Sequence, residues 1–145
     1  MRTNKQITDT LNQMDFITLC QTLYGEARGE ETQGRLAVVH VILNRVKRNG
    51  WMGKTVYDVC MKDQQFSCWN ERDPNCDKIK ALKWIEAENC GIYHDVKLAL
   101  NWWKVGEDVT NGATHYHTKY VHPKWSWDRV PCVEIGGHLF YNNME

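Results

Sequence analysis

The sequence predicts an α+β fold in which a helical body precedes a small antiparallel sheet near the C-terminus. Apolar residues recur at steps of three and four through most of the chain, a spacing typical of amphipathic helices. After Gly112 this spacing gives way to short alternating stretches separated by glycine and proline. With 145 residues, 42% apolar and 25% charged, the chain has the size of one globular domain, residues 1–145.

Two long helices are predicted in the first third of the chain. Residues 9–29 carry one apolar stripe, and Gly29 is expected to end it. Residues 35–48 form a second and more apolar helix, which we expect at the centre of the body, with Gly50 as its stop signal. The stripe of the first helix consists of Leu11, Met14, Ile17, Cys20, Leu23, Tyr24 and Ala27.

Three further helices follow. Thr55 is a predicted N-cap for a helix that runs through Met61. Residues 77–90 and 95–105 are predicted as two further helices, and Gly91 separates them. The alternating stretch "ATHYHT" and the final "HLFY" are then the predicted strands, with "IGG" as the turn before the second.

The charge and hydropathy of the chain exclude two classes of partner. Lys plus Arg and Asp plus Glu both number 18, so bulk charge gives no reason to expect nucleic-acid binding. The longest uninterrupted apolar run, Leu36 to Val39, is too short for a signal core or a membrane span. We expect neither membrane insertion nor a secretory signal, and therefore synthesis in the cytoplasm.

The six cysteines are predicted to be reduced thiols, with Cys20 in the core. An even number could form disulfides, but that prediction is weak without a secretory signal. No C-x-x-C pair is present, which argues against a zinc ribbon.

Seven short stretches, taken in order, resemble the catalytic domain of the SleB/CwlJ-type cell-wall hydrolases, known from lysis of the spore cortex. The resemblance covers about residues 17–141. The stretches are "LYGEARGE" (23–30), "AVVHVILNRV" (37–46), "TVYDVC" (55–60), "QFS" (65–67), "GATHYH" (112–117), Pro123 with Trp125, and "IGGHLFY" (135–141).

The resemblance implies a fold related to lysozyme-like lytic transglycosylases. It also implies cleavage of the peptidoglycan glycan strand between N-acetylmuramic acid and N-acetylglucosamine, without a cofactor, and Glu26 as the catalytic residue. His40 departs from the family pattern, which has a small residue there, and the family's export signal and wall-binding domain are not found. We therefore expect a monomeric phage endolysin released through a holin pore, or a bacterial enzyme exported by a partner, that acts on the wall.

Glu26 is suited to the role of general acid. It follows Leu23 and Tyr24 at the end of an apolar-faced helix, where a low-dielectric surround and the negative helix C-terminus both disfavour its ionised form. A purely structural alternative is that Glu26 caps the helix or pairs with Arg28.

Glu30 leaves two mechanisms open. If the helix continued past Gly29, Glu30 would share a face with Glu26, and two carboxylates at that spacing suit a retaining hydrolase. If it does not continue, Glu26 alone can perform lytic transglycosylation, with muramidase-type hydrolysis as the alternative. Glu30 would then bind Arg28, Arg35 or a backbone amide, or contact substrate.

The remaining expected substrate contacts are polar and aromatic. Strand alternation places His115 and His117 on one face and Tyr116 on the other. With His138 the two histidines could hold zinc, but we expect them to line the sugar groove instead, and they could equally be satisfied within the sheet. Gln65 and Ser67 are expected to bind sugar amides or hydroxyls, and Tyr24, Trp125, Trp127 and Tyr141 to contact sugar rings.

Two other classes of function stay open on the sequence. Cys20 with His115 or His117 has the chain order of a cysteine-dependent amidase or endopeptidase, although Cys20 falls on the apolar stripe. A wall-binding module without catalysis could use the tryptophans alone.

Overall fold

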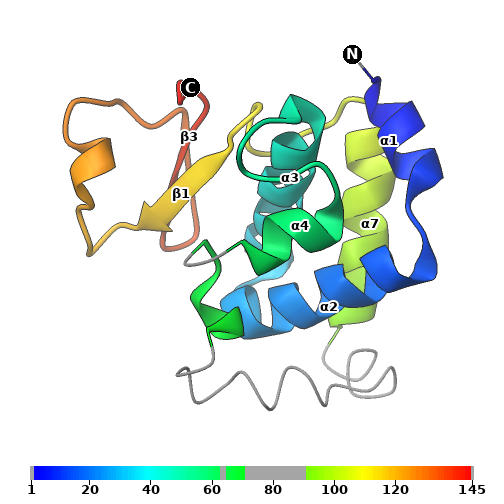
Figure 1. Ribbon diagram of the computed structural model, residues 1–145. Helices are drawn as coiled ribbons and strands as arrows, with labels where there is room; N and C mark the ends of the chain where they lie inside the picture. Colours follow the sequence, from blue (N-terminus) through cyan, green and yellow to red (C-terminus); the bar gives the residue numbers. More distant parts are fainter. Residues whose placement is uncertain (1, 63–64, 71–90, 145) are drawn as a thin grey trace.

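The computed structural model describes residues 2–62, 65–70 and 91–144, and it shows a helical body with a three-stranded sheet packed at one side (Figure 1). The predicted α+β architecture is therefore observed. The described elements are α1 (Asn4–Thr10), α2 (Gln13–Ala27), α3 (Thr32–Arg48), α4 (Val56–Met61), η1 (Ser67–Trp69), α7 (Ile92–Lys104), β1 (His115–Thr118), η2 (Lys124–Ser126), β2 (Val133–Ile135) and β3 (His138–Tyr141).

The predicted helix 9–29 is two helices, because the chain breaks at Leu11 and Asn12. Leu11 is extended, and the Asn12 side chain accepts a hydrogen bond of 2.8 Å from the Asp15 amide. The Asp15 carboxylate accepts one of 3.1 Å from the Asn12 amide, which completes a capping box. This capping box begins a new helix, α2, at Gln13. It ends at Ala27, two residues before Gly29.

Helix α3 confirms the predicted central helix and extends it to Thr32. It lies between the sheet and the other helices in Figure 1 and is buried along most of its length. Its left-handed C-cap is Asn49, with φ 55°, rather than Gly50. Asparagine tolerates this conformation because its short polar side chain can bond locally.

His40, the departure from the family pattern, is fully buried on α3. Its Nε2 donates to the Ala99 carbonyl of α7 at 2.9 Å, and its Nδ1 accepts from the Val109 amide at 3.1 Å. Both ring nitrogens are therefore satisfied, and the imidazole joins α3 to α7 and to the segment that leads into the sheet.

Helix α4 has the predicted bounds, and the Thr55 hydroxyl accepts from the Asp58 amide at 3.1 Å. Helix α7 begins at Ile92, three residues before the predicted 95–105 helix, and Gly91 precedes it with φ 78°. The predicted helix 77–90 lies outside the described residues.

The sheet has the order β1-β3-β2 with antiparallel pairs, and β2 was not expected from the sequence. His115 pairs with Tyr141 and Thr118 with His138 in the first ladder. The sheet packs on α3 through a small apolar cluster, which consists of Ala37, Val41, Ala113, Ile135 and Phe140.

Cys20 is buried, as predicted, in the main apolar cluster of the helical body, together with Cys60 and Cys68. Cys60 and Cys132 are free thiols, whereas Cys76 and Cys90 lie outside the described residues. Among the helices in the described part of the chain, none combines the length and apolar character needed to cross a bilayer.

Candidate active site

Glu26 lies half-buried in the last turn of α2, at the end of the helix nearer the sheet (Figure 1). Its carboxylate acts electrostatically on three side chains from three other elements. Burial raises the pKa of Cys60 on α4 and of Tyr116 on β1, and the Glu26 charge adds to both shifts. Burial lowers the pKa of Arg45 on α3, and the Glu26 charge is one of those that oppose this shift. Glu26 therefore lies where the helical body, α4 and the sheet meet.

Tyr116 is the sheet residue that reaches this junction. Its ring packs against the apolar cluster that contains Leu23 and Ala27 of α2, and it stacks on Phe140 with centroids 5.5 Å apart. Burial, followed by the Glu26 carboxylate, holds the pKa of the Tyr116 hydroxyl well above its usual value. The hydroxyl therefore stays protonated and can donate a hydrogen bond near Glu26.

Arg45 is a buried cation that the sequence analysis did not single out. Its Nε donates to the Thr114 carbonyl at 2.7 Å, and its guanidinium lies 5.1 Å from the Phe66 ring centroid. Burial lowers the pKa of Arg45, and the Tyr116, Cys60 and Glu26 groups oppose that effect. Helical spacing could have predicted that Arg45 is buried, because it follows Ile42 by three residues on the apolar stripe of α3.

Glu30 does not continue α2, as expected if the helix ends by Gly29, so the alternative in which Glu26 and Glu30 share one helix face is absent. The Glu30 Oε1 atom lies 3.0 Å from His138 Nδ1 on β3, in a site where both side chains are mostly buried. Gly34 and Gly136 close around it, since a Cβ at Gly136 would come within 2.9 Å of Glu30 Oε2. The expected Glu30 partners were arginines or an amide, and His138 was not considered.

The α2–α3 connection is fixed by two arginines. The Arg28 guanidinium lies 4.8 Å from the centroid of the half-buried Tyr24 ring. Arg35 donates to the Arg28 carbonyl at 2.6 Å and to Asp95 of α7 at 3.1 Å. These contacts hold the backbone immediately after Glu26 in place.

His115 and His117 lie on the opposite face of the sheet from Tyr116, as predicted, and there they are satisfied within the sheet region. The His117 Nδ1 atom donates to the Thr118 carbonyl at 2.7 Å, and Tyr141 Oη donates to His117 Nε2 at 2.8 Å. Trp125 contacts all three rings edge-on, with centroids 5.0 to 5.5 Å apart. We call His115, His117, Trp125 and Tyr141 the outer aromatic cluster.

The strand register argues against a zinc site formed by His115, His117 and His138. His138 pairs with Thr118, so it shares the inner face with Tyr116, whereas His115 and His117 share the outer face. Within the residues that the structure describes, no group of three or more histidine, cysteine or acidic side chains is placed to hold a metal ion.

His115 is also kept uncharged. Burial, followed by the charges of Arg45, Arg48 and Arg129, lowers the pKa of His115 to about 4. The ring is therefore neutral at neutral pH.

Gln65 is half-buried and directly precedes Phe66, the core residue under the Arg45 guanidinium. Ser67 lies in η1, and its side chain is outside the described part of the structure. Trp127 is 67% exposed, and its indole N–H donates to the His122 carbonyl at 3.0 Å.

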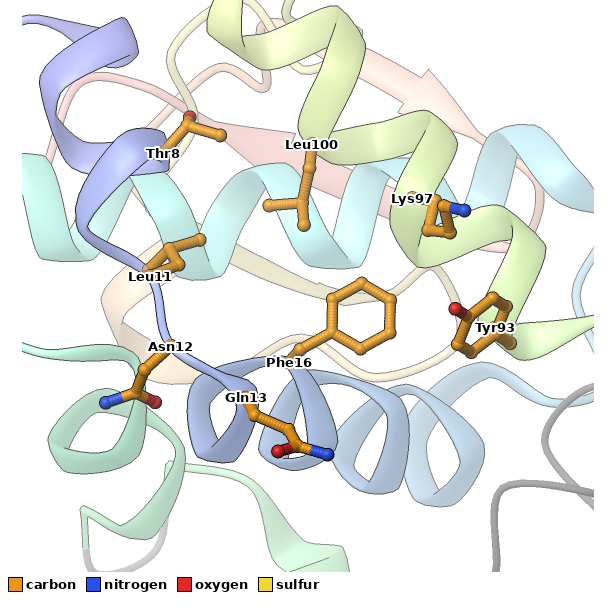
Figure 2. Close-up of a pocket in the computed structure, with 8 residues that line it drawn as sticks. All are labelled: Thr8, Leu11, Asn12, Gln13, Phe16, Tyr93, Lys97 and Leu100. Carbon is orange, nitrogen blue, oxygen red and sulfur yellow. The ribbon is translucent and has the colours of Figure 1, made fainter.

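A separate groove of about 680 Å³ lies between α7 and the connection from α1 to α2. Figure 2 shows Leu11, Phe16 and Leu100 turned toward its interior. Phe16 precedes Glu26 by ten residues on α2, about 15 Å along the helix axis. This groove is therefore distinct from the Glu26 junction.

A helical body with a small sheet and a half-buried glutamate at a helix end is the arrangement expected of a lysozyme-like cell-wall hydrolase domain. The chain belongs to the Cell Wall Hydrolase family, whose profile matches residues 29–141. That range begins three residues after Glu26, so the family match itself does not include the glutamate.

Alignments with individual relatives cover more of the chain than the family profile and include position 26. The spore cortex-lytic enzyme of Bacillus cereus is 31% identical over 134 residues, and that of Oceanobacillus iheyensis 28% identical over 129. Each alignment covers 89% of this chain but only 44% and 42% of those proteins, so the chain spans less than half of their length.

Two solved structures show the same fold. The catalytic domain of the Bacillus cereus SleB protein superposes with a TM-score of 0.73 at 30% identity, covering 97% of this chain and 98% of that one. The catalytic domain of a germination-specific lytic transglycosylase, SleB from Bacillus anthracis, gives 0.71 at 30% identity, covering 92% and 98%. The predicted family and fold are thus confirmed.

Proposed function

We propose that this domain cleaves the glycan strand of peptidoglycan between N-acetylmuramic acid and N-acetylglucosamine, with Glu26 as general acid and base. The observation that carries the proposal is the position of Glu26, half-buried at the end of α2 beside Tyr116 and Arg45. Family membership and the likeness to a lytic transglycosylase catalytic domain support the substrate and the reaction type.

The first step is protonation of the leaving group. Neutral Glu26 gives its proton to the glycosidic oxygen, the bond from that oxygen to muramoyl C1 breaks, and the electron pair stays on the oxygen. Burial and the negative end of α2 favour the protonated carboxyl that this step needs. The muramoyl ring is left with positive charge shared between C1 and its ring oxygen.

The second step closes the sugar on itself. The Glu26 carboxylate takes the proton of the muramoyl 6-hydroxyl, whose oxygen forms a bond to C1 and gives a 1,6-anhydro product. Glu26 is protonated again, and no water is consumed. A single carboxyl group is enough for this route.

The environment of Glu30 favours the one-carboxylate route. A nucleophile must reach C1 of the sugar, but the Glu30 carboxylate is held by His138 and lies against Gly136. Release of Glu30 would break the contact between the α2–α3 connection and β3. We therefore propose that Glu30 shapes the site, while Glu26 performs the chemistry.

Among the expected substrate contacts, Tyr116 interacts electrostatically with Glu26, and Gln65 directly precedes Phe66, which packs in one cluster with Leu23 and Ala27 of α2. We propose these two residues with Tyr24 as the first sugar contacts. The outer aromatic cluster lies on the other face of the sheet. We propose it as a contact only for a glycan strand that continues around the sheet edge.

Digestion of purified peptidoglycan, with the released muropeptides analysed by mass spectrometry, tests the proposal. Anhydromuramoyl ends are expected, and Glu26→Gln should lower their yield by at least about a thousandfold. Glu31→Gln is the matched control, because Glu31 is exposed and makes no capping bond from its side chain.

Three results would redirect or end the proposal. Reducing muramic ends would mean that water replaces the 6-hydroxyl, and the reaction would be hydrolysis with the same acid. Free stem peptides without glycan cuts would point to an amidase or endopeptidase. Sedimentation with the wall that releases no fragments would identify a binding module.

A further inference from the structure

Arg45 is fixed in position by contacts that come from both sides of the site. It is 4% exposed, and its Nε donates 2.7 Å to the Thr114 carbonyl, which immediately precedes β1. The Phe66 ring, from the α4–η1 segment, lies 5.1 Å from the guanidinium carbon. The charge therefore has a defined place between α3, β1 and η1.

The guanidinium is not fully satisfied. Among the described residues, Arg45 Nη1 has no hydrogen-bond partner and is almost completely shielded from solvent. Burial lowers the pKa of Arg45, and Glu26 is the carboxylate among the groups that oppose this effect. Because Nη1 is shielded from solvent, a substrate cannot reach it. Any effect of Arg45 on the reaction must therefore pass through neighbouring groups.

A buried cation without full pairing is costly. Removing an ion from water carries a large desolvation penalty, and apolar replacements of similar volume are often neutral or stabilising. If position 45 served only to pack α3 against the sheet, a methionine or leucine there would be sufficient. The retained charge needs a reason that packing does not supply.

We propose that Arg45 is a positioning residue of the Glu26 site, whose fixed positive charge favours the Glu26 carboxylate form that takes the proton in the second step. This inference rests on the proposed function. The helix end and burial favour neutral Glu26, and Arg45 opposes them. A group that must give and then take a proton works best when these influences balance near the working pH.

Among the described residues, three titratable groups beside Arg45 are neutral at neutral pH, whereas Arg48, one turn further along α3, is a second cation and donates to the Thr114 hydroxyl at 3.4 Å. On β1, the pKa of Tyr116 is raised by burial and that of His115 is lowered to about 4 by burial. On α4, burial raises the pKa of Cys60 to about 12. Cys68 of η1 faces Tyr116 and adds to the rise in its pKa. Glu26 acts electrostatically on Arg45, Tyr116 and Cys60, and of these three groups Arg45 is the one that is charged.

A matched pair of variants tests the inference through the pH dependence of glycan cleavage. Arg45→Lys and Arg45→Gln both lose the forked guanidinium, but only Arg45→Gln loses the charge. The alkaline limb of the kcat/KM profile reports loss of the proton from the acid in the free enzyme. We expect Arg45→Gln to move this limb upward by about one pH unit, while Arg45→Lys keeps it near the wild-type position.

The outcomes separate this inference from the proposed function. If wild-type protein cuts no glycan, the function fails, whatever Arg45 does. If wild type cuts but Arg45→Gln lowers activity equally at every pH, or Arg45→Lys shifts the limb as far as Arg45→Gln, the inference is overturned. Arg45→Met is the second uncharged variant. If both uncharged variants fail to fold while Arg45→Lys folds, the charge is structural and the inference also falls.

Discussion

Glu30, in the connection between α2 and α3, binds His138 of β3 through an Oε1–Nδ1 contact of 3.0 Å. This pair joins the segment that follows Glu26 to the inner face of the sheet. Tyr116 packs edge-on against the same histidine ring, with centroids 5.4 Å apart. The inner face of the sheet is therefore tied to the segment after Glu26 by the Glu30–His138 contact, and Tyr116 packs on the same histidine ring.

Glu30→Gln should separate the structural role of Glu30 from a nucleophilic one. The amide keeps the shape but loses the charge, so we expect a loss of about 1 kcal/mol in the free energy of unfolding. Glycan cleavage per folded molecule should stay within about threefold of wild type, since this corresponds to less than 1 kcal/mol in the barrier. Urea denaturation and muropeptide yield are the measurements, with Glu31→Gln as control. Inactivation as deep as that of Glu26→Gln would instead support a two-carboxylate mechanism.

Gly136→Ala should destabilise the protein, and Gly137→Ala should not. Gly136 has φ 58° and its added Cβ would lie 2.9 Å from Glu30 Oε2, whereas nothing lies within 4 Å of a Cβ at Gly137. A methyl group at Gly136 therefore meets both backbone strain and the Glu30 carboxylate, and we expect a loss of about 1 to 3 kcal/mol. The unfolding midpoints of the two variants test this, and equal midpoints would show that the turn does not press on Glu30.

His115 should make the protein less stable as the pH falls from about 6.5 to about 4. Because burial lowers the pKa of His115 to about 4 in the folded protein, the unfolded chain binds a proton in this window while the folded state does not. Stability from this group is therefore complete above pH 6.5 and declines toward pH 4. Thermal melts of wild type and His115→Gln across this range should differ in slope, with exposed His94→Gln as control. Parallel slopes for wild type and His115→Gln would mean that His115 titrates alike in both states.

Cys20→Ala should leave glycan cleavage intact. Cys20 is 2% exposed and lies in the apolar core, so a thiolate there has no access to substrate. We expect a loss of about 1 kcal/mol in stability from the small cavity, and muropeptide release within about twofold of wild type. Loss of all activity in a folded Cys20→Ala protein would revive the cysteine-dependent amidase.

The sequence determined the elements whose signals are local. The apolar stripe of α3 and the Thr55 cap of α4 depend on residues within one or two helical turns of each other, and both elements formed as predicted. The break at Asn12 also has a local signal, the Asn12–Asp15 capping box. The prediction missed it because the apolar stripe continues across the break. Strand β2 has only three residues, and its pairing with β3 rather than its own pattern makes it a strand.

Tertiary structure alone decided which polar groups meet around Glu26. Glu30 with His138, Arg45 with Thr114, and Tyr116 with the end of α2 are partners far apart in the chain. Local periodicity fixes which face a side chain takes, but not which distant face it meets, because that depends on how the helices and the sheet pack. The sequence by itself therefore pointed to Glu26, whereas the packing of the sheet against α3 placed a buried cation and a protonated tyrosine beside it.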